Sequence, residues 1–510
     1  MISSALLLLL ALPTHALPLV QETGEPWSPT IPTLWDDEAI ERTELPLASR
    51  EHSPRHVPRS YYERIPTRTI WADYPVYHPD HEPPGYWDWL HEQEPRIAFD
   101  PAELRTKEDW IRAGERVFRQ GDGYTTGTEL AFVRDPRGYE AAGVRLTADG
   151  RFPYARYVVR ELGKVELEVN SCAGCHTRVL PDGSELLGGP GDVPLGRIAA
   201  YELRELAPPA TSDERVDRDG FDYRFAAAPW MDPDPGALAL GRDREGLAQL
   251  LEALTPGVFV RQRTSYAHPV RTPDLIGVAN RRFLDATGLF ESNGLADLAR
   301  YAALNFGVDE LASYDGFRPA AEDGRTLPDP ATLVRNSDEQ LWALALFLES
   351  LEAPERPRTG TTDEERDAVE RGAALFDEEG CVRCHAPPHY TNDRLVPVAA
   401  HTPTPEERER WNPMRRRVGT DPGLTLRTRR GTGYYKVPSL RGVWYRPSFL
   451  HDGSLATLED LFDPARLGED YVPTGYRGPF GTRRSVPGHP FGLERTAAER
   501  ADLIAFLRSL

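Results

Sequence analysis

Two copies of the pattern Cys-x-x-Cys-His constrain this chain more than any other feature. They are Cys172-Ala-Gly-Cys175-His176 and Cys381-Val-Arg-Cys384-His385, and they use all 4 cysteines of the 510 residues. Chance would produce about 0.001 copies of such a pentad at this composition. Cysteines three apart at the start of a helix share one face, so both sulfurs can bond the vinyl groups of one porphyrin. The pattern predicts two covalently bound c-type haems, with His176 and His385 as proximal iron ligands.

Three other uses of paired cysteines fit less well. A zinc ribbon would combine the two pairs, but they lie far apart in the chain and each carries an adjoining histidine. A thioredoxin-like dithiol needs a βαβ setting that neither copy has. Structural disulfides would suit an exported protein but give the histidines no purpose.

Length and charge exclude several classes of protein. A chain of 510 residues exceeds what one hydrophobic core supports, so more than one domain is expected. The formal net charge of −20 would repel phosphate backbones, which excludes nucleic acid as a partner. Apart from Lys107, Lys164 and Lys436, the basic residues are arginines, which suit carboxylate partners such as haem propionates.

The first residues are typical of a secretory signal peptide. An apolar run from Ala5 to Leu12 precedes Pro13 and the small-residue site Thr14-His15-Ala16. No later stretch reaches the roughly 18 to 20 apolar residues that cross a bilayer, so no membrane anchor is expected. The sequence predicts a signal peptide at 1–16 and a periplasmic or secreted protein.

An internal repeat sets the domain plan. Three segments recur in the same order, which indicates two related domains. The paired segments are 112–118 with 370–376, Arg271-Thr-Pro-Asp-Leu-Ile-Gly-Val278 with Lys436-Val-Pro-Ser-Leu-Arg-Gly-Val443, and Phe347-Leu-Glu-Ser-Leu351 with Phe506-Leu-Arg-Ser-Leu510.

Helix-start signals agree with this repeat. Capping boxes are expected at Ser337 with Gln340, Thr362 with Glu365, and Thr496 with Glu499. A first helix, a haem motif, a loop region and a terminal helix together resemble the cytochrome c fold, used twice. The expected fold is therefore mainly α, with domains at 106–351 and 362–510 and a linker at 352–361.

Two further segments surround these domains. Residues 17–105 form an N-terminal extension that is rich in proline but also in aromatics, which predicts a segment packed irregularly over the domains. Between Phe118 and Cys172 the first domain carries an insert with alternating polarity at 164–169, following Tyr157-Val158-Val159 and a turn near Gly163. A small β-hairpin is predicted there, either as a wall over the first haem or as a cover for a core.

The second axial ligand decides what each haem can do. In cytochrome c folds it usually comes from a loop before the last helix, which makes His489 the candidate distal ligand of the second haem, with Tyr471 as the second choice. Met414 lies beside three arginines and is expected in a solvated loop.

The matching segment of the first domain, from Thr287 to Gln340, has no histidine, methionine or cysteine. Met231 or His268 could replace them, but an open or water-bound iron is the leading expectation for the first haem.

The second domain also carries Phe449-Leu-His451-Asp452-Gly453-Ser-Leu after the Pro-x-Leu-x-Gly-Val element. With two fused cytochrome c domains, residues 106–510 resemble the bacterial di-haem cytochrome c peroxidase superfamily, which includes MauG-like proteins and di-haem rubber oxygenases. A second haem bound by two histidines is more similar to the rubber oxygenases. The resemblance implies a haem oxidoreductase, peroxidase-like or oxygenase-like.

Two functions remain open at this point. In the first, peroxide or dioxygen binds at the first haem and electrons pass through the second haem. In the second, the protein is an electron-transfer cytochrome c without catalytic activity. Either function needs a redox partner such as a small cytochrome, a cupredoxin or a quinol. No catalytic acid or base is assigned from the sequence.

Overall fold

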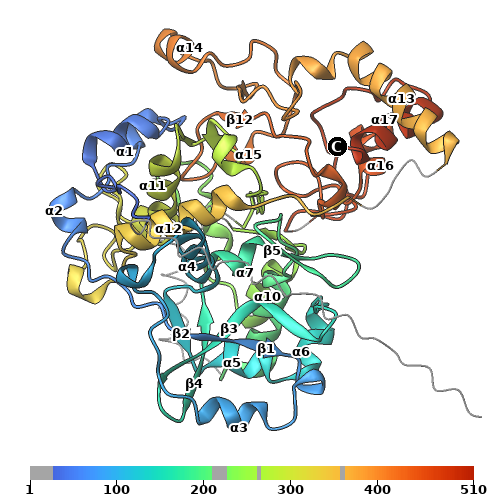
Figure 1. The fold of residues 1–510 in the computed structure, drawn as a ribbon. Helices are drawn as coiled ribbons and strands as arrows, with labels where there is room; N and C mark the ends of the chain where they lie inside the picture. Colours follow the sequence, from blue (N-terminus) through green and yellow to red (C-terminus); the bar gives the residue numbers. More distant parts are fainter. Residues whose placement is uncertain (1–26, 209–226, 261–265, 357–361, 480) are drawn as a thin grey trace, which may run out of the picture.

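The computed structural model describes residues 27–208, 227–260, 266–356, 362–479 and 481–510. The expected signal peptide and part of the expected linker lie outside these residues. These residues fall into three regions, which we call the extension (27–105), the first half (106–356) and the second half (362–510). Figure 1 shows the second half, in orange and red, lying along one side of the first half.

The fold is mainly helical, as expected. The extension and first half hold α1 (Asp37–Thr43), α2 (Arg59–Tyr62), α3 (Tyr86–His91), α4 (Lys107–Arg119), α5 (Thr128–Val133), α6 (Pro136–Ala142), α7 (Cys172–His176), α8 (Leu195–Tyr201), α10 (Arg244–Glu252), α11 (Leu295–Asn305) and α12 (Asp338–Ser350). The second half holds α13 (Asp363–Glu378), α14 (Pro405–Trp411), α15 (Gly423–Leu426), α16 (Leu458–Leu461) and α17 (Ala497–Arg508). Short 3-10 turns include η7 (Val278–Asn280), η10 (Cys381–Arg383) and η11 (Val443–Tyr445).

The strands are short apart from one hairpin. They are β1 (Asp73–Tyr77), β2 (Gly123–Thr125), β3 (Arg151–Glu161), β4 (Lys164–Val169), β5 (Thr177–Val179), β6 (Glu185–Leu187), β7 (Val258–Phe259), β8 (Val270–Arg271), β9 (Phe283–Leu284), β10 (Phe290–Glu291), β11 (Leu395–Pro397) and β12 (Tyr434–Lys436). The predicted hairpin is confirmed as β3 and β4, which pair antiparallel around Gly163. It is larger than expected, because β1 from the extension and β2 complete a sheet in the order β1-β3-β4-β2.

The internal repeat appears as the same helix pair in both halves. α4 packs on α12, and α13 packs on α17. At the first crossing a side chain on Gly114 would lie 2.0 Å from the Ala343 carbonyl oxygen, and at the second a side chain on Gly372 would lie 2.0 Å from that of Asp502. A phenylalanine pair flanks each crossing with 5.2 Å between ring centres, Phe118 with Phe347 and Phe376 with Phe506.

All three predicted capping boxes are confirmed. Ser337 caps α12, Thr362 caps α13 and Thr496 caps α17. Each cap side chain accepts a hydrogen bond from the backbone N–H of the third helical residue, and that residue's side chain accepts one from the backbone N–H of the cap. Each box satisfies two of the N–H groups that a helix start leaves free.

The two halves exchange equivalent contacts across their interface. The Arg271 amide donates to the His451 carbonyl, and the Lys436 amide, at the matching repeat position, donates to that of Ala286. The loops that hold these carbonyls turn the same way, with positive φ at Asp285 and at Leu450. The reciprocal pairs relate the halves as the two subunits of a symmetric dimer are related.

The extension is packed, as predicted. Trp35 is buried and stacks on Tyr62 with 4.5 Å between ring centres, inside the core that contains α4 and α12. The extension also reaches the second half, because Arg430 donates to Glu44 at 3.0 Å while it pairs with Asp309 of the first half. Removing one member of a buried ion pair strongly destabilises the folded protein. This cluster therefore holds the three regions against one another.

The glycine at the α13–α17 crossing gives the first prediction. Gly372→Ala should lower the free energy of unfolding by about 1 to 3 kcal/mol, because the added methyl group forces two packed backbones apart. Denaturant unfolding followed by circular dichroism measures this change. Glu370→Ala, an exposed change on the same helix, should stay within about 0.5 kcal/mol of the parent. Equal stability of both variants would contradict the close helix crossing.

Candidate cofactor sites

A cavity of about 600 Å³ lies in the second half around the Cys381–His385 motif. Helices α13 and α17, the loop before α17 and the repeated Pro-x-Leu-x-Gly-Val segment form its walls. Most of its wall is apolar, and its apolar members include Phe376, Val443, Phe449, Leu458, Leu461, Phe462, Leu503 and Leu507. The volume and apolar lining are those of a site for a cofactor-sized molecule.

His385 is oriented as a ligand into this cavity. Its Nδ1 lies 3.2 Å from the Tyr390 carbonyl oxygen, and the backbone of Pro438 also hydrogen-bonds the ring. A backbone acceptor at Nδ1 leaves the lone pair of Nε2 for a metal. Burial lowers the pKa of His385 to about 4, so the ring is the neutral form that metals bind.

His489 stands across from it. The two ring centres lie 6.3 Å apart, and both residues line the cavity. Two imidazoles that share one metal at about 2 Å from each nitrogen would have ring centres about 6 Å apart. Burial, and then the neighbouring His385, lowers the pKa of His489 to about 4. The structure thus brings together the two residues that the sequence proposed as axial ligands.

Arg466, which the sequence analysis did not identify, holds the His489 loop. It is fully buried and donates to the carbonyl oxygens of Val486, Gly488 and His489, the last two at 2.9 and 3.0 Å. The loop needs this support because His489 has a φ of 49°, in the left-handed region. No local signal marks this role of Arg466, since its three partners in the loop lie 20 or more residues away.

Two other candidates lie elsewhere. Tyr471 is not among the described residues that line the cavity. Met414 does line it, at an edge where its sulfur accepts from Asn392 at 3.5 Å, so the expectation of a fully solvated loop is wrong for this side chain. Its exposed neighbours Arg415 and Arg416 line the same edge.

The first half repeats the proximal arrangement. His176 Nδ1 lies 3.1 Å from the carbonyl oxygen of Pro273, which is the repeat equivalent of Pro438. Ser171 caps the single-turn helix α7 that carries the motif, whereas the second motif begins in the 3-10 turn η10. In both halves the Pro-x-Leu-x-Gly-Val element therefore supplies a carbonyl that orients the motif histidine.

His268 and Met231, the two alternative ligands for the first-half haem, have surroundings unlike those of His489. His268 lies against Gly423, and Asp421, His451 and Asp452 of the second half act on its charge. Burial lowers the pKa of His268 to about 4. Met231 follows Trp230, which stacks on Tyr314 with 5.7 Å between ring centres.

The cysteines fit a haem attachment better than the other uses. Cys172 packs against the core of the first half and Cys381 against that of the second, so the pairs do not converge on one zinc ion. No disulfide joins any of the four. Burial raises the pKa of Cys172 to about 12 and that of Cys175 to about 11, unlike the lowered values of redox-active dithiols.

The second-half cavity passes a direct test of fit for haem. It offers two thiols on one side, two neutral imidazoles at metal-sharing distance, and apolar walls. Basic side chains in its lining, among them Arg271 and Arg446, suit the carboxylates of a porphyrin. Among the described residues, none of the helices is long and apolar enough to cross a bilayer.

Comparisons with known proteins agree with this chemistry. No family model matches the chain. It is 30% identical over 160 residues to cytochrome-c peroxidase IdrP1 of Denitromonas iodatirespirans, covering 28% of this chain and 40% of that protein. It is also 30% identical over 200 residues to the methylamine utilization protein MauG of Methylorubrum extorquens, covering 36% of this chain and 50% of that protein.

The chain thus spans half or less of each relative's length in these alignments. The solved diheme peroxidase BthA of Burkholderia thailandensis covers 82% of this chain and 91% of its own at 19% identity, with a TM-score of 0.29, too low to define a common fold. The two relatives and the paired motifs support the resemblance of this chain to the di-haem cytochrome c peroxidase and MauG-like superfamily.

Proposed function

We propose that this protein is an exported di-haem redox enzyme that reduces peroxide or dioxygen at the first-half haem, with electrons supplied through the second-half haem. The observation that carries the proposal is the difference between the halves. His385 and His489 face each other at 6.3 Å, whereas the segment from Thr287 to Gln340 offers no equivalent ligand. Two fused cytochrome c domains, each with one covalent haem, are part of the proposal.

Bound haem would supply the iron and electron storage for this chemistry, in which peroxide takes two electrons and two protons to form two waters. The chain's own residues have four roles. Cys172 and Cys175, and Cys381 and Cys384, attach the porphyrins. The carbonyl oxygens of Pro273 and Pro438 orient the two proximal histidines. Arg466 holds His489 in place, and the apolar walls of the second site exclude water.

The axial ligand pair also sets a direction for the redox potential. Two imidazole ligands, from His385 and His489, would favour the ferric state of a bound haem relative to a His/Met pair, in which the thioether raises the potential. The second-half haem should therefore be a comparatively strong reductant. The apolar run from Ala5 to Leu12 motivates the proposal that the protein is exported. Export in turn agrees with covalent attachment, because thioether bonds prevent haem loss outside the cell.

Haem attachment is tested by removing one cysteine pair at a time. The double change Cys172→Ala with Cys175→Ala, or Cys381→Ala with Cys384→Ala, should leave one covalent haem per chain, because each pair serves its own porphyrin. Mass spectrometry of the denatured protein counts the attached haems. Absence of any haem mass on the parent protein would end the proposal.

The axial role of His489 is tested by spectroscopy. His489→Ala should convert the second-half haem from low-spin to high-spin, because the iron loses its sixth ligand. Arg466→Leu should give a partial conversion, since the loop loses three hydrogen bonds but keeps the imidazole. Arg477→Leu, a change of the same type at a residue outside the cavity lining, is the control. An unchanged low-spin spectrum in His489→Ala would assign the ligand to another residue.

The reactive site is identified with carbon monoxide. Reduced protein should bind one carbon monoxide per chain, at the first-half haem. His176→Ala should abolish or strongly shift this signal, while His385→Ala should leave it in place. Two assays then show which oxidant the enzyme uses. The first measures consumption of hydrogen peroxide with a reduced cytochrome or quinol, and the second measures dioxygen uptake with an unsaturated hydrocarbon. Carbon monoxide binding at neither haem, with no turnover of either oxidant, would leave a non-catalytic electron carrier.

A further inference from the structure

Four arginines line one edge of the second-half cavity and form what we call the arginine rim: Arg383, Arg394, Arg415 and Arg416. Arg383, Arg415 and Arg416 are exposed, so the cavity reaches the surface where they stand. Arg417 is exposed beside them. The rim is notable because the chain as a whole carries a net charge of −20.

The positive charge of the rim is not neutralised locally. Among the described residues, none of these four arginines nor Arg417 forms an ion pair with a carboxylate. Arg394 instead donates to Asn412 and Pro413, and Arg417 to the carbonyls of Val398 and His401. Arginines held by neutral groups keep their full charge available to an approaching anion.

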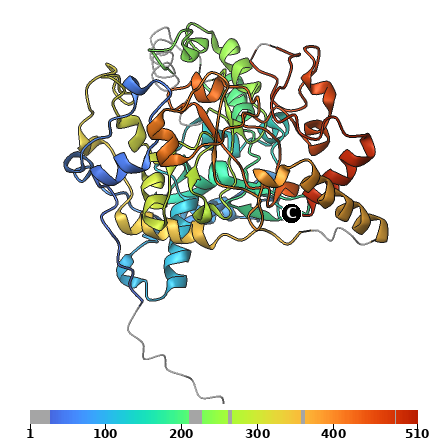
Figure 2. The same ribbon diagram turned by 90° about the horizontal axis from the view of Figure 1, so that it is seen from above.

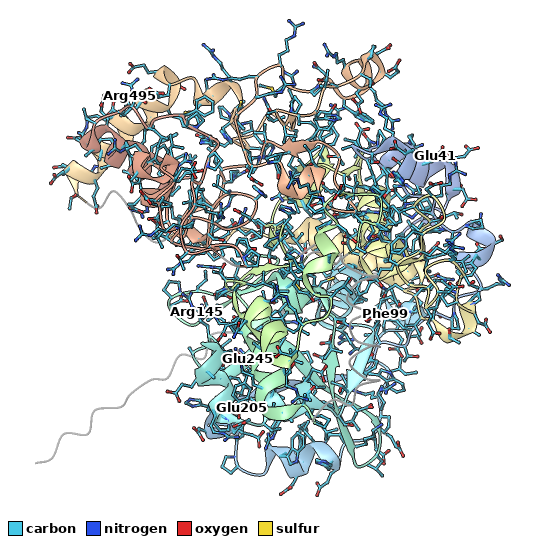
Figure 3. The ribbon with its side chains drawn as sticks, turned by 180° about the vertical axis from the view of Figure 1, so that it is seen from behind. Glu41, Phe99, Arg145, Glu205, Glu245 and Arg495 are labelled. Atoms are coloured by element: carbon cyan, nitrogen blue, oxygen red, sulfur yellow. The ribbon has the colours of Figure 1, made fainter. Side chains whose placement is uncertain are left out.

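The carboxylates near the rim, unlike its arginines, have basic partners. Glu378 and Glu379, at the end of α13, both pair with Arg495, which Figure 3 labels near the edge of the second half. Asp393 lines the cavity, where Lys436 acts on its charge. The net field at the Cys384 side of the cavity is therefore positive.

One aromatic side chain, Phe491, connects the rim to the candidate axial ligand. The Arg416 guanidinium lies 4.3 Å above the Phe491 ring, and Phe491 lies 5.1 Å from His489 between ring centres. Arg416 and Arg394 are also the charged groups nearest in effect to Cys384, one of the two attachment points. A partner seated on the rim would thus be separated from the cofactor site by single side chains.

We propose that the arginine rim is the docking surface for an acidic electron-transfer protein that delivers electrons to the second-half haem. The inference rests on the proposed function and narrows its redox partner to a protein with a negatively charged contact face. One electron passes in each encounter, so the partner is oxidised by one electron and the ferric haem reduced by one. No bond is made or broken, and no proton need move.

Small inorganic oxidants test the local field first. Haem-loaded protein reduced with dithionite is mixed with ferricyanide, an anion, or with tris(phenanthroline)cobalt(III), a cation. The rim predicts faster oxidation of the low-spin haem by ferricyanide, falling about tenfold as salt rises to several hundred millimolar. The net charge of −20 alone would predict the reverse preference, so faster reaction with the cation would overturn the inference.

Charge reversal then locates the effect. Arg415→Glu with Arg416→Glu should slow ferricyanide about tenfold and accelerate the cobalt complex. Arg105→Glu with Arg325→Glu makes the same change of charge at one exposed position of the extension and one of the first half, and should alter neither rate appreciably. Equal effects of the two double variants would also overturn the inference, because net charge would then explain them.

A protein probe tests the partner class. Reduced plant-type [2Fe–2S] ferredoxin, an acidic donor with a potential near −400 mV, should reduce the second-half haem in a salt-sensitive reaction that the rim variant loses. Binding of the parent, but not the rim variant, to anionic vesicles without salt-sensitive reduction by ferredoxin would assign the rim to a membrane surface instead. Haem content is measured first, so that missing haem counts against the proposed function and not against the rim.

Discussion

A hydrogen bond between Nδ1 of each motif histidine and a backbone carbonyl is the contact on which both sites depend. In the first half it joins His176 to Pro273, and in the second it joins His385 to Tyr390, with the backbone of Pro438 as a further partner of the ring. It fixes which ring nitrogen carries the proton, and so which one is left for a metal. The helix pairs, capping boxes and glycine crossings of each half hold the motif and the proline segment at this distance.

The same duplication produces both the stability and the asymmetry of the molecule. A loop of each half bonds to the other half through the Arg271–His451 and Lys436–Ala286 backbone hydrogen bonds. Figure 2, seen from above, shows the second half, in orange and red, lying across the first half. Within this near-symmetric frame the second half has His489 facing its motif histidine. A repeat whose backbone is alike but whose ligands differ can hold one relay site and one reactive site.

Local signals in the sequence predicted the parts of the fold that local interactions determine. The cysteine motifs, the capping boxes and the β3–β4 hairpin involve residues close in the chain, and the structure contains each of these elements. The role of Arg466 could not be predicted, because the three carbonyls that it holds belong to a loop 20 or more residues away. The ion-pair cluster of Arg430, Asp309 and Glu44 could not be predicted for the same reason, since each of its members comes from a different region of the chain.

The central claim is that one iron has two protein ligands and the other has an open position. Electron paramagnetic resonance of the oxidised, as-isolated protein tests it most directly, because high-spin and low-spin ferric haem give separate signals. The account predicts both signals in equal amounts, with the low-spin signal in the range of bis-imidazole haems. Two low-spin haems would contradict it.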